Sequence, residues 1–131
     1  MSPSANRESA LNASALAGVY ARYDSLRVID ITARPAEDMV RIKYMSALTD
    51  AEQTSFLGKL KETAESKEKL EAVCANVRRL GAPTYHPTYM TQHGMAALLI
   101  GDPNDGLIPN YDSAHAWSSA LTEFLHCTPK A

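Results

Sequence analysis

The stretch that decides the fold is residues 50–80, DAEQTSFLGKLKETAESKEKLEAVCANVRRL. It holds one glycine and no proline, and it is rich in the Lys, Glu, Ala and Leu that favour helices. Directly before it, Thr49 and Glu52 have the spacing of a capping box, in which each side chain accepts a hydrogen bond from the other residue's backbone N–H. The stretch therefore predicts helical structure that begins near Asp50.

Two apolar faces run along this stretch. The first consists of Phe56, Leu57, Leu60 and Ala64, and the second of Leu70, Val73, Cys74 and Val77. At about 100° per residue, the second face is turned by roughly 90° from the first. Because one straight helix cannot place both faces against the same partner, we predict a bend or short break near residues 65–67.

Helical spacing of apolar residues continues on both sides of residues 50–80. It is seen in Leu16, Val19, Tyr20, Tyr23 and Leu26, in Met39, Val40, Tyr44, Met45 and Leu48, and in Ala114, Trp117, Leu121, Phe124 and Leu125. Asn6 or Ser9 is a candidate cap for the first helix, Pro35 fits the first turn of the second, and the last begins near Asp112 or Ser113.

Residues 26–32 fit a continued helix or a short strand. We favour the helix because no second strand of comparable quality is present to pair with them. Gly81 and Pro83 end the central helices, and Pro87 opens a further helix that runs to Gly101.

The predicted fold is all-α, a compact bundle of five or six helices in a single domain over residues 1–131. Residues 1–5 are expected to be a disordered tail. An irregular segment near 81–87 and a loop at 101–112 interrupt the helices. The length is in the usual range for one domain.

The charge balance and the chain ends limit the possible functions. Thirteen basic and fifteen acidic residues give a net charge of −2, so no basic excess drives nucleic-acid binding. The longest apolar run, residues 95–100, is too short to span a membrane. The first residues have no signal-peptide pattern, which fits either a cytosolic protein or the mature form of an exported one.

Cys74 and Cys127 are the only cysteines, and they lie 53 positions apart. This spacing excludes a local zinc site. A disulfide would tie the C-terminal helix to the middle of the chain and imply an oxidising compartment, whereas the alternative is a pair of reduced thiols. We slightly favour an exported, periplasmic location over a cytoplasmic one.

The candidate binding surface lies in a stretch without charged residues. No Asp, Glu, Lys or Arg occurs between Arg79 and Asp102, and such a segment is either buried or covered by a partner. Tyr, Met and His are typical of contact surfaces or of helix interiors. The residues predicted to bind a partner are Tyr85, His86, Tyr89, Met90 and His93, together with Asp102, Asn104 and Asp105 of the following loop.

Catalytic and metal-binding patterns find no support. His86 and His93 lie two helical turns apart, too far for one zinc ion, and the HExxH pattern is absent. The acidic loop after Gly101 departs from the EF-hand pattern. No nucleophile motif or phosphate-binding glycine loop occurs. We therefore predict no metal and no cofactor.

The function that remains is a non-catalytic protein-binding domain. Its partner is another protein or a second copy of the chain, as in a small bacterial inhibitor, immunity or accessory protein. The alternative is a small helical enzyme or ligand carrier, with a pocket lined by Tyr85, His86, Tyr89, His93 and Trp117.

Overall fold

The structure is a computed structural model that describes residues 3–95, 99 and 103–128, with side chains from Leu11 onward. Its described residues form an all-α bundle, as predicted. The α-helices are α1 (Pro3–Arg27), α2 (Ala36–Ser46), α3 (Asp50–Glu65), α4 (Lys67–Leu80), α5 (Thr88–Thr91) and α7 (Ser113–Phe124). Two short 3-10 helices, η1 (Ile31–Ala33) and η2 (Pro103–Gly106), lie between them.

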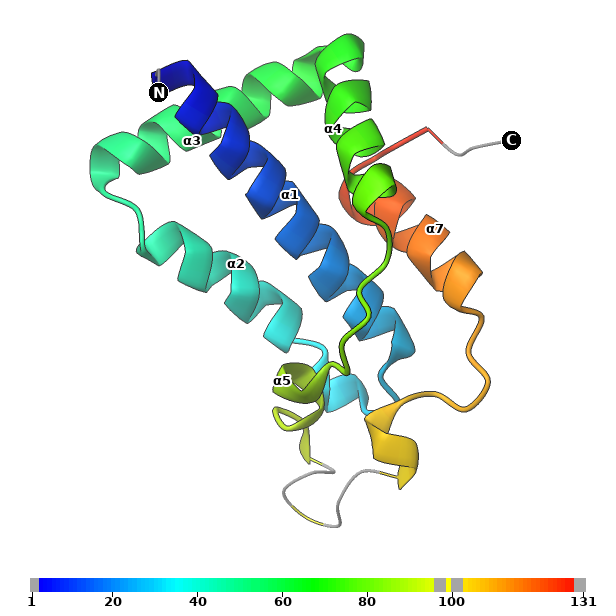
Figure 1. The fold of residues 1–131 in the computed structure, drawn as a ribbon. Helices are drawn as coiled ribbons and strands as arrows, with labels where there is room; N and C mark the ends of the chain where they lie inside the picture. The colour runs from blue at the N-terminus through cyan, green and yellow to red at the C-terminus, as the bar shows by residue number, and fades with distance from the viewer. Residues whose placement is uncertain (1–2, 96–98, 100–102, 129–131) are drawn as a thin grey trace.

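Helix α1 is the centre of the bundle. Figure 1 shows α2 on one side of it and α4 and α7 on the other, with α3 crossing near its N-terminal end. The main core includes Leu11, Val19 and Tyr23 of α1, which recur at helical spacing on its buried side. The helix already includes residues 3–5, which the sequence analysis assigned to a disordered tail.

The boundaries of α3 and α4 confirm the predictions made from residues 50–80. Thr49 and Glu52 form both hydrogen bonds of the capping box. Ser66 has extended backbone angles between the two helices, and its side chain caps α4 by accepting from the N–H of Lys69. The break lets the Val73–Val77 face of α4 enter the core while α3 follows a different direction.

Residues 26–32 form neither the continued α-helix that we favoured nor a strand. Helix α1 continues to Arg27, and Val28 then forms an isolated antiparallel bridge with Leu107. The N–H of Ile108 donates to the Arg27 carbonyl at 2.8 Å. The end of α1 is thereby joined to the segment that follows η2.

The helix predicted from Pro87 to Gly101 is interrupted: α5 ends at Thr91, residues 92–94 form a turn and a bend, and Met95 and Leu99 are again helical. At the interruption, the N–H of Met95 donates to Thr32 Oγ1 at 2.8 Å. Gly94 packs so closely on η1 that an added Cβ would lie 2.4 Å from Asp30 Oδ2. Contacts with η1 therefore replace helical hydrogen bonds, while residues 96–98 and 100–102 of the prediction lie outside the described part.

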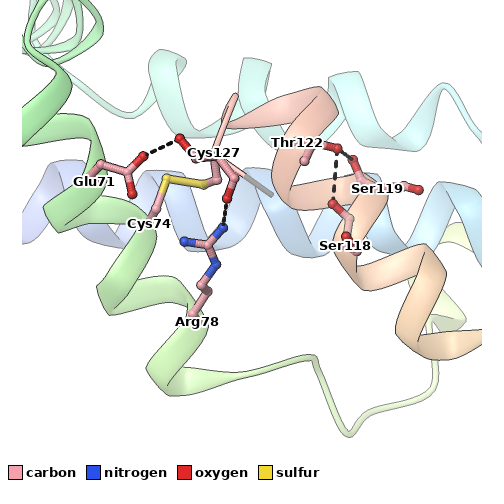
Figure 2. The surroundings of a disulfide bond; sticks show 8 residues. Glu71, Cys74, Arg78, Ser118, Ser119, Thr122 and Cys127 are labelled. Atoms are coloured by element: carbon pink, nitrogen blue, oxygen red, sulfur yellow. Dashed lines mark hydrogen bonds between the residues drawn. A yellow bond between two sulfur atoms is a disulfide. The ribbon is translucent and has the colours of Figure 1, made fainter. Parts of the chain in front are cut away.

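A disulfide joins Cys74 of α4 to Cys127, with the two Cα atoms 5.9 Å apart. Figure 2 shows Glu71 and Arg78 of α4 on either side of Cys74, and both side chains bind Thr128. Its Oγ1 donates to Glu71 at 2.8 Å, and its carbonyl accepts from Arg78 at 2.5 Å. The segment after α7 is therefore held against α4 by covalent and polar contacts.

No helix among residues 3–95, 99 and 103–128 has the length and apolar character needed to cross a membrane. The longest helix, α1, lies at the centre of the bundle, and none of its residues from 18 to 27 is exposed.

Close packing between α1 and α7 provides a first test of the fold. An added Cβ on Gly18 would lie 2.1 Å from Phe124 Cζ, whereas one on Gly58 of α3 would meet nothing within 4 Å. We expect Gly18→Ala to lower the free energy of unfolding by about 1–3 kcal/mol through overpacking. Gly58→Ala, the matched control, should raise it by about 0.5–1 kcal/mol through helix propensity. Urea unfolding measures both, and equal stabilisation would contradict the close α1–α7 contact.

Candidate functional site

A buried ion pair lies on the last turns of α1. The side chain of Asp24 is fully buried and Arg27 is 5% exposed. Arg27 Nε donates to Asp24 Oδ1 at 2.9 Å, and Nη2 lies 2.7 Å from the same oxygen. The spacing of three residues places both on one helix face. A buried pair of this kind needs further hydrogen bonds to offset the loss of water.

Two tyrosines from the uncharged stretch supply those bonds. The hydroxyls of Tyr85 and Tyr89 both donate to Asp24 Oδ2, at 2.9 and 2.6 Å. Arg27 Nη2 also donates to the Tyr85 carbonyl at 2.9 Å. Burial, and then the carboxylate of Asp24, raise the pKa of both tyrosines above the usual value of 10.0. The two hydroxyls therefore remain protonated donors in neutral solution.

Aromatic rings surround the Arg27 guanidinium. It lies 4.8 Å from the centroid of the Tyr23 ring, a favourable cation–π geometry. Trp117 of α7 lies 5.9 Å from the rings of both Tyr20 and Tyr23. Burial, reinforced by the hydroxyl of Tyr111 at 3.4 Å, raises the pKa of Tyr23 to about 12. Helices α1 and α7 thus form a rigid base beneath the two tyrosines.

The rings of Tyr85 and Tyr89 nevertheless reach the surface. The two residues are 43% and 42% exposed, although their hydroxyls point inward to a buried carboxylate. His86 is also exposed, and its Nε2 donates to the Asp105 carbonyl at 2.8 Å. This bond places η2 beside the segment that precedes α5. We call Tyr85, His86, Tyr89 and Asp105 the tyrosine surface.

The remaining predicted residues are placed differently. His93 and Asn104 are exposed, and Asn104 Nδ2 donates to the Leu107 carbonyl at 2.9 Å. Asp102 lies outside the described residues. Met90 requires a correction, because its side chain is fully buried against Val28, Ala33 and Ala36, and it offers no surface to a partner.

Both oxygens of the fully buried Asp24 carboxylate accept hydrogen bonds. Arg27 occupies one carboxylate oxygen and the two tyrosine hydroxyls occupy the other. The role of this network in the structure is to fix residues 85–89 to α1. In the described part of the chain, no three His, Cys, Asp or Glu side chains are grouped as metal ligands.

A pocket of about 350 Å³ lies elsewhere in the bundle, and the sequence analysis did not predict it. Five helices or their flanking residues contribute to its almost entirely apolar wall. The wall consists of Leu11, Ser14, Ala15, Arg41, Tyr44, Met45, Phe56, Leu57, Leu60, Thr63, Ala64, Leu70, Val73, Phe124, Leu125 and His126. We call it the apolar pocket.

The apolar pocket is not the one considered as an alternative in the sequence analysis, because none of Tyr85, His86, Tyr89, His93 and Trp117 lines it. One signal for it was present in the sequence. Phe56, Leu57, Leu60 and Ala64, the first apolar face of residues 50–80, all lie in its wall. The pattern identified the face, but it did not show that the other helices leave part of that face uncovered.

Comparisons with protein families, with curated proteins and with solved structures found no match to this chain.

Proposed function

We propose that this chain is a non-catalytic protein-binding domain that contacts its partner through the tyrosine surface. The observation that carries the proposal is the half-exposed state of Tyr85 and Tyr89, whose hydroxyls are fixed by Asp24. Aromatic residues of this kind often dominate the affinity of protein interfaces.

Fixing the rings before binding favours association. A mobile aromatic side chain loses conformational freedom when a partner covers it, and that loss opposes binding. Here Asp24 holds both rings in the free protein, so the loss on association is small. Exposed apolar side chains on neighbouring segments, Ile31 at 69% and Met95 at 50%, extend the area available to a partner.

The surroundings of the rings resemble the edge of a contact surface. His86, His93, Asn104 and Asp105 are exposed polar residues from two segments of the chain. A ring of polar residues around aromatic anchors is typical of transient protein interfaces. A small bacterial inhibitor, immunity or accessory protein fits this description, and the Cys74–Cys127 disulfide favours an oxidising compartment such as the periplasm.

Partner capture tests this proposal. The immobilised wild-type protein is exposed to an extract of its native host, and chemical cross-linking of the pure protein tests self-association. We expect Tyr89→Ala to retain at least about tenfold less partner, the usual effect of losing a central aromatic anchor. Met39→Ala removes an equally exposed apolar side chain (55%) from α2 and should retain the partner fully.

Two further variants separate a lost contact from lost folding. Tyr89→Phe keeps the ring and removes the hydrogen bond to Asp24, so we expect partial capture. Circular dichroism must show folded protein for every variant compared. If folded Tyr89→Ala captured the same partner as the wild type in the same amount, the tyrosine surface would not be the binding surface.

A further inference from the structure

We propose that the apolar pocket binds a single-chain amphiphile with a carboxylate head, such as a medium-chain fatty acid. The acyl chain would occupy the pocket, and the carboxylate would bind the guanidinium of Arg41. This binding site is separate from the tyrosine surface and does not depend on the function proposed above.

The size and the chemistry of the pocket both favour one acyl chain. A volume of about 350 Å³ lies near the lower end of the range for small-molecule sites, roughly 300–1,000 Å³. Leu11, Phe56 and Leu70 contribute apolar walls from three different helices. Few polar groups reach the pocket, so a ligand with several hydrogen-bonding groups along its length would leave them unsatisfied.

The pocket also exposes apolar surface that a ligand would cover. Leu57 and Leu60 line it and are 53% and 40% exposed. A ligand that covers these two leucines is favoured, because its binding removes their apolar surface from water. An acyl chain between α3 and α1 would provide that cover.

Arg41 provides the reason to choose an acidic head. Among the described residues that line the pocket, it is the only Lys, Arg, Asp or Glu. Its guanidinium lies 5.6 Å from the centroid of the Phe124 ring, another wall residue, which holds the charge beside the apolar surface. A guanidinium binds a carboxylate through two parallel hydrogen bonds.

Asp38 competes for the same guanidinium, with which it forms an ion pair. That pair is exposed, with 45% of the Arg41 side chain and 62% of the Asp38 side chain accessible to water. Exposed ion pairs of this type are weak, so a ligand carboxylate can replace or share the contact. His126 is a further polar residue in the wall.

Calorimetric titration with three probes of one chain length tests the head and the chain separately. The probes are sodium decanoate, decanol and decyltrimethylammonium, each below its aggregation concentration. We expect decanoate to bind one-to-one and about threefold more tightly than decanol, the effect of a partly exposed ion pair. Decyltrimethylammonium should bind more weakly than decanol because of Arg41.

Matched variants identify the site. Arg41→Gln should weaken decanoate binding about threefold and leave decanol binding unchanged, whereas Lys43→Gln, an exposed change on the same helix, should leave both unchanged. Ala64→Phe fills the pocket from its wall and should abolish both. Ala75→Phe, an exposed change on α4 outside the pocket wall, should not.

Three results would overturn the proposal: no saturable binding of decanoate, equal affinities for the three probes, or unchanged decanoate affinity in Ala64→Phe. Circular dichroism with and without decanoate separates binding from denaturation by the probe. The partner-capture experiment tests the tyrosine surface and not the apolar pocket. A negative result in one experiment therefore contradicts only the proposal that it tests.

Discussion

Asp24→Ala is expected to lower the free energy of unfolding by about 3–5 kcal/mol, because it leaves the buried guanidinium of Arg27 without its counter-ion. Arg27 is only 5% exposed, so water cannot replace the lost carboxylate. The hydroxyls of Tyr85 and Tyr89 lose their acceptor at the same time. Urea denaturation followed by far-UV circular dichroism measures the change.

Asp38→Ala is the matched control, since it removes a carboxylate from an exposed pair with an arginine three positions further along the chain. We expect it to change the free energy of unfolding by less than about 1 kcal/mol. Asp24→Asn keeps the shape and part of the hydrogen bonding, and its effect should lie between the two. A loss in Asp24→Ala no larger than in Asp38→Ala would show that the Asp24–Arg27 pair is not buried.

Removal of the disulfide has the second largest expected effect. The double variant Cys74→Ala/Cys127→Ala should lose about 4 kcal/mol of unfolding free energy, the chain-entropy value for a loop closed over this separation. The bridge spans 53 positions and encloses α5, η2 and α7. Urea unfolding of the wild type and of the double variant, both without reductant, gives the difference.

Reductant provides the control for this experiment. It should lower the unfolding midpoint of the wild type toward that of the double variant and leave the double variant unchanged. Titration of thiols in denaturant gives an independent measurement. Two free thiols in the purified, unreduced protein would contradict the disulfide itself, whatever the denaturation curves show.

Local sequence signals predicted the helices well where the deciding contacts are themselves local. The capping box at Thr49 and the break at Ser66 are set by residues within a few positions of each other, and both were confirmed. The same is true of the start of α7, where the Asp112 side chain accepts from the N–H of His115 at 3.0 Å. Hydrogen bonds of this kind can be predicted from the sequence because the two residues that form them are only a few positions apart.

The network that fixes the tyrosine surface could not be predicted in this way. Asp24 and Arg27 have the spacing of an ordinary exposed helix pair, and nothing in α1 shows that they are buried. Their tyrosine partners lie 61 and 65 positions away along the chain. The sequence analysis singled out the uncharged stretch after Arg79, and two tyrosines of that stretch donate to the Asp24 carboxylate near the end of α1.

The apolar pocket and the early end of α5 share one physical cause. Both depend on how far neighbouring helices approach, which periodicity along one helix does not specify. After α5, Gly94 packs against Asp30 and Ala33, and the N–H of Met95 donates to Thr32 of η1. The face that begins at Phe56 lines the pocket together with residues of α2 and of the end of α7.

The cross-link between Cys74 and Cys127 makes the second half of the molecule a closed ring. A protease that nicks the backbone once at any position inside this ring produces two polypeptides that stay covalently attached. Tyr85, His86 and Tyr89 all lie within it. The fragment that carries them therefore cannot diffuse away after such a nick.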